Sequence, residues 1–116
     1  KESSAASDVY KRQAQYKLGG MYNEGQGVPQ DYKEAVKWYR LSVEQGDALA
    51  QLKLGVMYYQ GTGVLQDYAL AHMWFNLSGS NGSKVAVHER NIIEKKMTPS
   101  QIEEAQRMAR NWKPKK

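Results

Sequence analysis

Few residues in this sequence have the type and spacing that catalysis or metal binding requires. The two histidines, His72 and His88, lie 16 positions apart in a chain without cysteine, and no carboxylate stands at a spacing typical of a ligand set. There is no nucleophile elbow, no Walker loop and no HExxH motif. We therefore predict that the protein is not an enzyme and has no catalytic residue, metal site or cofactor.

The strongest pattern in the sequence is a repeat with a period of 36 residues. Aligning residues 14–49 on 50–85 gives 18 identities in 36 positions, and Gly25-x-Gly27-Val28 returns as Gly61-x-Gly63-Val64. A period of this length is typical of stacked repeats, in which one unit cannot bury its apolar face alone. Such stacks present extended surfaces, which favours binding over catalysis as the function.

Each unit is predicted to be an antiparallel pair of helices. The first helix of the first unit ends in the Gly25–Pro29 turn, and Asp31 is expected to cap the second helix in a capping box with Glu34. Gly46 is expected to end that helix in the left-handed conformation. The caps predicted for the later helices are Asp47, Asp67, Ser83 and Thr98.

Several positions inside these helices carry predictions about packing. Gly19 and Gly55 lie within first helices, where glycine costs about 1 kcal/mol relative to alanine, so their recurrence predicts a close approach of two helices. Trp38 and Trp74 are predicted to pack between the helices of their own unit and the next. His72 replaces a valine of the first unit, and we expect it to have a packing or surface role.

The two ends of the chain depart from the repeat. Residues 1–13 match nothing in the later units, and we interpret them as a foreign or artefactual segment. The unit around Ala14–Tyr22 would then lack an N-terminal neighbour, which favours a homodimer through this end. Residues 86–116 are predicted to form two capping helices and a basic tail, with Thr98-Pro99-Ser100-Gln101 beginning the last helix.

The net charge of +5 lies entirely in the last part of the chain. Residues 1–83 carry eight basic and eight acidic side chains, whereas residues 84–116 carry nine basic and four acidic ones. This excess leaves open weak binding of nucleic acid or an anionic surface through the C-terminal unit, although a solvated helix face explains it as well. No run of about 20 apolar residues could span a membrane.

Over residues 14–112 the sequence resembles the Sel1-like repeat family, a relative of the tetratricopeptide repeats. The residues that carry the resemblance are Ala14, Leu18-Gly19, Tyr22, Gly25-x-Gly27-Val28, Asp31, Ala35, Trp38-Tyr39 and Gly46, with Ala50, Leu54-Gly55, Tyr58, Gly61-x-Gly63-Val64, Asp67, Ala71, Trp74-Phe75 and Gly82. The resemblance implies an all-α, right-handed solenoid of two helix pairs with a capping pair. It also implies an adaptor that binds a protein or peptide. Both a cytoplasmic and a periplasmic or secreted location remain open.

By analogy with tetratricopeptide stacks, the first helices are expected to line the concave face. The predicted contact residues on that face are Tyr16, Asn23, Tyr59, Gln60, His88 and Lys95. Tyr16 and Tyr59 are the expected anchors, because tyrosine often dominates interface energetics. His88 and Lys95 would favour an acidic or C-terminal peptide. A face that packs on further repeats or is simply solvated remains the alternative, and no small-molecule substrate is expected.

Overall fold

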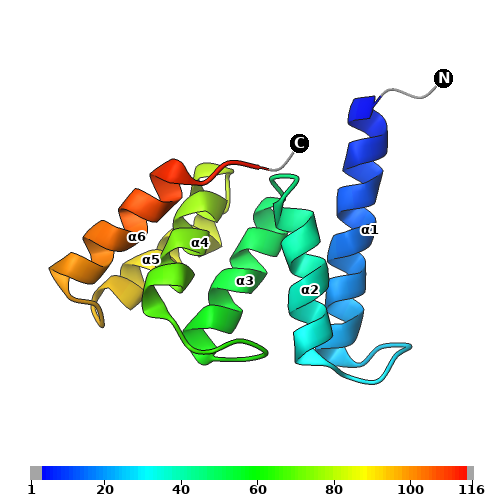
Figure 1. Cartoon of the computed structure of the whole chain (residues 1–116), viewed down its shortest axis with the longest axis horizontal. Helices are drawn as coiled ribbons and strands as arrows, with labels where there is room; N and C mark the ends of the chain where they lie inside the picture. The colour runs from blue at the N-terminus through cyan, green and yellow to red at the C-terminus, as the bar shows by residue number, and fades with distance from the viewer. Residues whose placement is uncertain (1–3, 115–116) are drawn as a thin grey trace.

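The chain forms a stack of α-helices. A computed structural model describes residues 4–114, with the side chains of residues 9–114, and within this range it contains six helices and no strand (Figure 1). The helices are α1 (Ser4–Glu24), α2 (Tyr32–Val43), α3 (Ala48–Gln60), α4 (Tyr68–Ser80), α5 (Lys84–Glu94) and α6 (Pro99–Asn111). The predicted all-α solenoid of helix pairs is confirmed.

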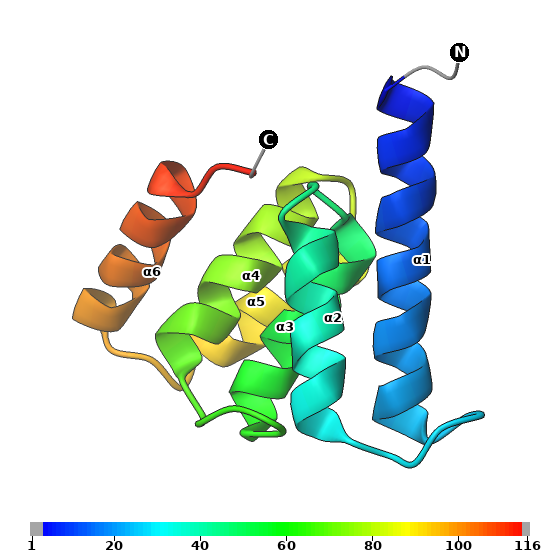
Figure 2. The same ribbon diagram turned by 45° about the vertical axis from the view of Figure 1, so that its right-hand side comes forward.

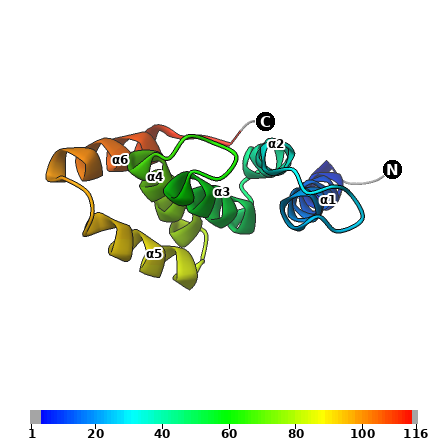
Figure 3. The ribbon, with the colours of Figure 1, turned by 90° about the horizontal axis from the view of Figure 1, so that it is seen from below.

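The helices are arranged in two layers. Figure 3 shows α2, α4 and α6 along one side of the molecule and α1, α3 and α5 along the other. Along the stack α1 packs on α2, α2 on α3 and α3 on α4, while both capping helices, α5 and α6, pack on α4. Helix α1 is longer than the other helices, and its N-terminal part extends beyond the end of α2 (Figure 2).

Most predicted helix caps are confirmed. The side chains of Asp31, Asp67 and Ser83 each accept a hydrogen bond from the backbone N–H three residues later, at 3.0 to 3.1 Å. Thr98 and Gln101 form a complete capping box at the start of α6, where each side chain accepts from the other residue's backbone N–H. These bonds satisfy backbone donors that have no partner inside a helix.

Only one of the two hydrogen bonds of the capping box predicted for Asp31 and Glu34 forms, so the other half of that prediction is wrong. The Asp31 N–H donates to the carbonyl of Tyr22 at 2.9 Å, so it is not available to the Glu34 carboxylate. Glu34 instead lies 3.7 Å from the ammonium of Lys37, one turn further along the same helix. The backbone of Asp31, the cap residue of α2, is therefore hydrogen-bonded to α1, the first helix of the pair.

Each repeat is also closed at its other end. The Ser42 hydroxyl donates to the carbonyl of Arg12 at 3.0 Å, and the Ser78 hydroxyl donates to the carbonyl of Ala48 at 2.7 Å. Arg12 and Ala48 are one period apart, so this repeat contact begins before Ala14, inside the segment interpreted as foreign. Residues 4–13 continue α1 without a break, whereas residues 1–3 lie outside the described range.

The outer face of α1 lacks the cover that its counterparts have. Ala50 and Ala86 have 0 % of their surface exposed, whereas Ala14, at the equivalent position, is exposed. Tyr10, one turn earlier, is 66 % exposed. Self-association through this end of the stack stays a prediction.

The recurring glycines of the first helices lie against aromatic rings. A Cβ added at Gly19 would stand 2.6 Å from ring atoms of Tyr39, and one at Gly55 would stand 2.5 Å from the ring of Phe75. Tyr39 and Phe75 are themselves 1 % exposed and occupy the same position in the two repeats. The predicted close approach is confirmed, and the two rings take the space that a methyl group would fill.

We expect the Gly19→Ala variant to be less stable than the wild type by about 1–3 kcal/mol, because the methyl group would displace the Tyr39 ring. Gly20→Ala is the matched control, since its Cβ would lie 3.8 Å from the Tyr39 hydroxyl, an ordinary contact. Helix propensity should stabilise that control by up to about 1 kcal/mol. Urea denaturation followed by circular dichroism measures both, and equal stabilities would contradict the packing.

The two repeat tryptophans are not equally buried. Trp74 is 8 % exposed, and its ring meets that of Trp112 edge to face with centroids 5.7 Å apart. Trp38 is only half-buried, although its indole Nε1 is buried, so its packing between units stays a prediction. Helix α6 covers Trp74, but α4 does not pack closely on α2, and the Lys37 ammonium lies 6.0 Å from the centroid of the Trp38 ring.

Candidate functional site

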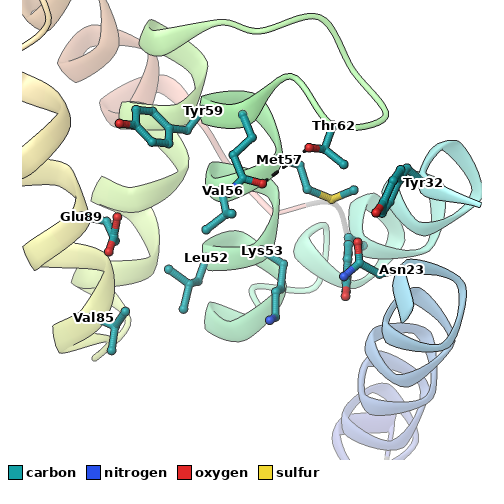
Figure 4. A pocket seen from close by; sticks show the side chains of 12 residues that line it. Asn23, Tyr32, Leu52, Lys53, Val56, Met57, Tyr59, Thr62, Val85 and Glu89 are labelled. Atoms are coloured by element: carbon teal, nitrogen blue, oxygen red, sulfur yellow. Dashed lines mark hydrogen bonds between the residues drawn. The ribbon is translucent and has the colours of Figure 1, made fainter. Parts of the chain in front are cut away.

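The inner helices enclose a hollow of about 450 Å³ on the side of the molecule formed by α1, α3 and α5 (Figure 4). Helix α3 forms its floor, α5 one wall, and the end of α1 with the start of α2 the other. Its lining residues are Asn23, Tyr32, Tyr39, Leu52, Lys53, Val56, Met57, Tyr59, Gln60, Thr62, Val85 and Glu89. A hollow bounded by four helices is concave and partly apolar, as binding sites commonly are.

The sequence of α3 explains why apolar side chains reach this floor. Leu54 is 0 % exposed and Met57 is 4 % exposed, so these two residues belong to the core between the layers. Leu52, Val56 and Tyr59 lie on another side of the same helix and are half-buried. Figure 4 shows the side chains of Leu52 and Val56 directed toward α5 rather than toward α1.

A second hollow of about 260 Å³ continues the first one toward α1. Both hollows are lined by Tyr39 and Lys53, so they lie next to each other on the inner helices. The other residues of the second hollow are Tyr16, Lys17, Gly20, Met21, Glu24 and Gln26. We call the two hollows together the inner groove.

Two tyrosines lie side by side in the inner groove. The rings of Tyr16 and Tyr39 have centroids 5.7 Å apart. Burial raises the pKa of the Tyr39 hydroxyl strongly, and burial, followed by the charges of Asp47 and Glu24, raises the pKa of Tyr16. Both hydroxyls therefore stay protonated at neutral pH and can donate hydrogen bonds to a ligand.

Tyr59 is held in place by its neighbours. Its ring lies 5.7 Å from that of Tyr68, and the Lys96 ammonium lies 5.4 Å from the centroid of the Tyr59 ring. The Tyr59 side chain raises the pKa of Lys96. The side chain of Tyr59 is thus both a packing residue and part of the wall of the groove.

Two unpaired charges line the larger hollow. Lys53 and Glu89 are both half-buried, and within the described residues neither has a hydrogen bond or an ion pair. Lys17, Lys53 and Glu89 occupy the same position in three successive units, so the charge at that position changes sign between α3 and α5. Opposite charges at fixed places can orient a charged ligand.

The predicted contact residues are only partly brought together. Asn23, Tyr59 and Gln60 line the larger hollow, and Tyr16 lines the smaller one. His88 on α5 and Lys95 directly after α5 are exposed and line neither hollow. The sequence reasoning missed Lys53, because it selected positions that differ between the first two units, where both have lysine. It also missed Glu89; the sign change across the three units was the available signal.

The buried histidine belongs to a different part of the structure. The His72 side chain is 1 % exposed, and its Nε2 lies 2.7 Å from Oε2 of Glu94 on α5. Its Nδ1 is buried without a hydrogen-bond partner. The predicted packing role is thus observed, and the pair links the second repeat to the cap. In the described part of the chain, no group of three or more His, Asp or Glu side chains is arranged to hold a metal ion.

We expect Glu94→Ala to destabilise the protein by about 1–3 kcal/mol, because the buried His72 Nε2 would lose its partner. Glu94→Gln retains a polar partner and should lose less. The double variant His72→Val with Glu94→Ala should regain most of the loss, since valine occupies this position in the first repeat. Thermal unfolding of the wild type, the two Glu94 variants and the double variant measures the effect, and a double variant no more stable than Glu94→Ala would contradict the coupling.

Comparisons with known proteins agree with the fold. The family model of the Sel1 repeat matches residues 12–47 and 48–83. No curated protein sequence gives a significant match. None of the described helices is both long and apolar enough to cross a membrane.

Two solved structures are similar to this chain. One is a protective antigen present in uropathogenic Escherichia coli strains, displaying an SLR fold, with 38 % identity and a TM-score of 0.83 over 90 % of this chain and 22 % of that chain. Another is a Sel1 repeat protein from Oxalobacter formigenes, with 32 % identity and a TM-score of 0.69 over 75 % of this chain and 36 % of that chain. This chain therefore spans less than two fifths of either neighbour's length.

Proposed function

This chain belongs to the Sel1 repeat family, and from that premise we propose that it holds a segment of a partner protein in the inner groove. Proteins built from Sel1 repeats are generally scaffolds for protein interactions and are typically not catalytic. The partner segment would lie against α3, between α5 and the end of α1.

The observation that carries this proposal is the apolar surface of the inner helices. Leu49, Val85 and Ile92 are 54 %, 58 % and 37 % exposed, although large apolar side chains gain free energy when water is excluded from them. Val85 lines the same hollow as the half-buried Leu52 and Val56, whereas Leu49 and Ile92 lie outside it on the same two helices, α3 and α5. Neighbouring exposed apolar side chains with polar groups around them are typical of interaction sites.

The groups in the groove support binding rather than a reaction. Lys53 and Glu89 are the unpaired charges of the larger hollow, and no second acidic or basic group stands close enough to either to form a described ion pair. A general acid–base mechanism needs a group positioned by another against a reacting atom. Tyrosine hydroxyls, amides and apolar side chains instead resemble the composition of protein interfaces.

We expect Val85→Asp to abolish binding of a partner captured with the wild-type protein, because a carboxylate would replace an apolar contact in the hollow. Val85 is more than half exposed, so the fold should be unaffected. Leu65→Asp is the matched control, since Leu65 is 90 % exposed in the turn between α3 and α4, outside the hollow. Calorimetry with the purified partner measures affinity, and equal affinity of the three proteins would refute the proposal.

Weak binding of nucleic acid through the C-terminal unit is the second candidate function. The excess of positive charge at 84–116 favours it, but some of these groups are already engaged: Arg107 forms an ion pair with Glu104, and Arg90 donates to Asn76 at 3.4 Å. A gel-shift titration with mixed-sequence RNA at two salt concentrations separates the candidates, since affinity for nucleic acid falls steeply with salt.

A further inference from the structure

The floor of the inner groove has the spacing of a helix-binding seam. Leu52, Val56 and Tyr59 of the floor follow one another along α3 at intervals of four and three residues, and Leu49, outside the two hollows, lies three residues before Leu52. This alternation is the one by which one α-helix packs against another along a shared seam. All four side chains keep exposed surface, so within the described residues no helix of this chain fully covers the seam.

The residues that line the larger hollow extend along α3, which is the direction in which a bound partner helix would lie. Its α3 residues run from Leu52 to Gln60, which is about two turns and about 12 Å along the helix axis. Val85 and Glu89 form the wall on the α5 side, and Asn23 forms part of the opposite wall. A segment that fills this hollow therefore runs beside α3 for more than one turn.

The charges beside the seam differ in sign on its two sides. Figure 4 shows Lys53 on one side of Leu52 and Val56, and Glu89 on α5 on the other side. Lys17 and Glu24 line the smaller hollow together with Lys53, and of these three charged residues Lys53 alone also lines the larger hollow. Because Lys53 and Glu89 have no partner among the described residues, both are available to a ligand.

From the seam, its direction and the two charges, we infer that the occupant of the inner groove is a single amphipathic α-helix of a partner protein, lying along α3. Its apolar stripe is bordered on one side by acidic residues that face Lys53, and on the other side by basic residues that face Glu89. This inference rests on the proposed function and adds the conformation and charge pattern of the bound segment.

Designed peptides test this inference. The probe is a peptide of about 21 residues with leucine at both seam positions of each heptad, glutamate along one flank and lysine along the other. Two relatives carry the same seam with glutamate on both flanks or lysine on both flanks. We expect the mixed peptide to bind about tenfold more tightly than either relative in fluorescence anisotropy at low salt, because only it complements both charges.

Two further measurements separate a helix from other occupants. A mixed peptide with a central proline should lose binding, because proline breaks a helix. Glu89→Lys should transfer the preference to the peptide with glutamate on both flanks, and Leu65→Asp should leave every affinity unchanged. These results would support the inference.

Other outcomes would overturn it. Undiminished binding of the proline peptide would mean an extended segment, and equal binding of the three charge patterns would remove the role of Lys53 and Glu89. No binding of the mixed peptide, or a homodimer that Val85→Asp dissociates, would also refute a partner helix. In each case, loss of a captured partner with Val85→Asp would still support the groove as the binding site, so failure of this inference is distinguishable from failure of the proposed function.

Discussion

A chain that ends at Lys96 will lose more than about 4 kcal/mol of stability and its single cooperative unfolding transition. Helix α6 closes the stack by covering α4: Ala105 is 0 % exposed and Trp112 packs on Trp74. Ile102 and Met108 are also packed against the core, and burial of a large apolar side chain contributes about 1.5–3 kcal/mol. Repeat stacks need such a terminal unit because each unit contacts only its neighbours.

Urea denaturation followed by circular dichroism at 222 nm measures this loss. The control is a chain that ends at Lys113, which retains α6 and Trp112 and should match the full chain within about 0.5 kcal/mol. An unchanged urea midpoint for the chain that ends at Lys96 would show that α6 does not cap the stack.

The Trp74→Ala variant will lose about 3–5 kcal/mol, the cost of removing a large buried ring and leaving a cavity. Trp74 is 8 % exposed and contacts the ring of Trp112, so its loss also removes an aromatic pair between α4 and the C-terminal end of α6. The matched variant is Trp38→Ala at the same position of the first repeat, where the ring is half-buried. We expect it to lose less than half as much.

Denaturation followed by far-ultraviolet circular dichroism suits both variants, because each change removes a fluorophore. A greater loss for Trp38→Ala than for Trp74→Ala would contradict the burial of these two side chains. Equal losses would mean that α6 contributes nothing to the environment of Trp74.

The parts of the fold that depend on local chemistry could be predicted from the sequence. The caps at Asp31, Asp67 and Thr98 follow from one side chain and the nearby backbone. Likewise Gly46 ends its unit with a φ of +82°, a conformation that glycine adopts without steric cost. The repeat supplied a second copy of most signals, which is why helix pairs could be recognised without knowing their contacts.

Features that depend on neighbours in space could not be predicted in the same way. Trp38 and Trp74 are equivalent in sequence but differ in burial, because only Trp74 has α6 beside it. The Glu34 carboxylate has a suitable spacing for a capping box, but the Tyr22 carbonyl already accepts from the N–H that it would need. In both cases the observed structure depends on residues of another helix.

The candidate site also has some residues that could be predicted from the sequence and others that could not. Residues on the inner faces of α1 and α3 could be found by analogy, and Asn23, Tyr59 and Gln60 do line one hollow. His88 and Lys95 were placed there by the repeat period, yet α5 turns them away from it. The charge reversal at Glu89 needed a comparison of three units rather than two.

The serine contacts at the ends of the repeats determine how parts of the protein can open. A helix pair held only by its turn can fray from its free ends, one helix at a time. Here Ser42 and Ser78 bind the end of each second helix to the first helix of the same pair, through the carbonyl of Arg12 within α1 and that of Ala48 at the start of α3. Amide protons of both helices in a pair should therefore become accessible together, so the unit of local unfolding is the whole repeat.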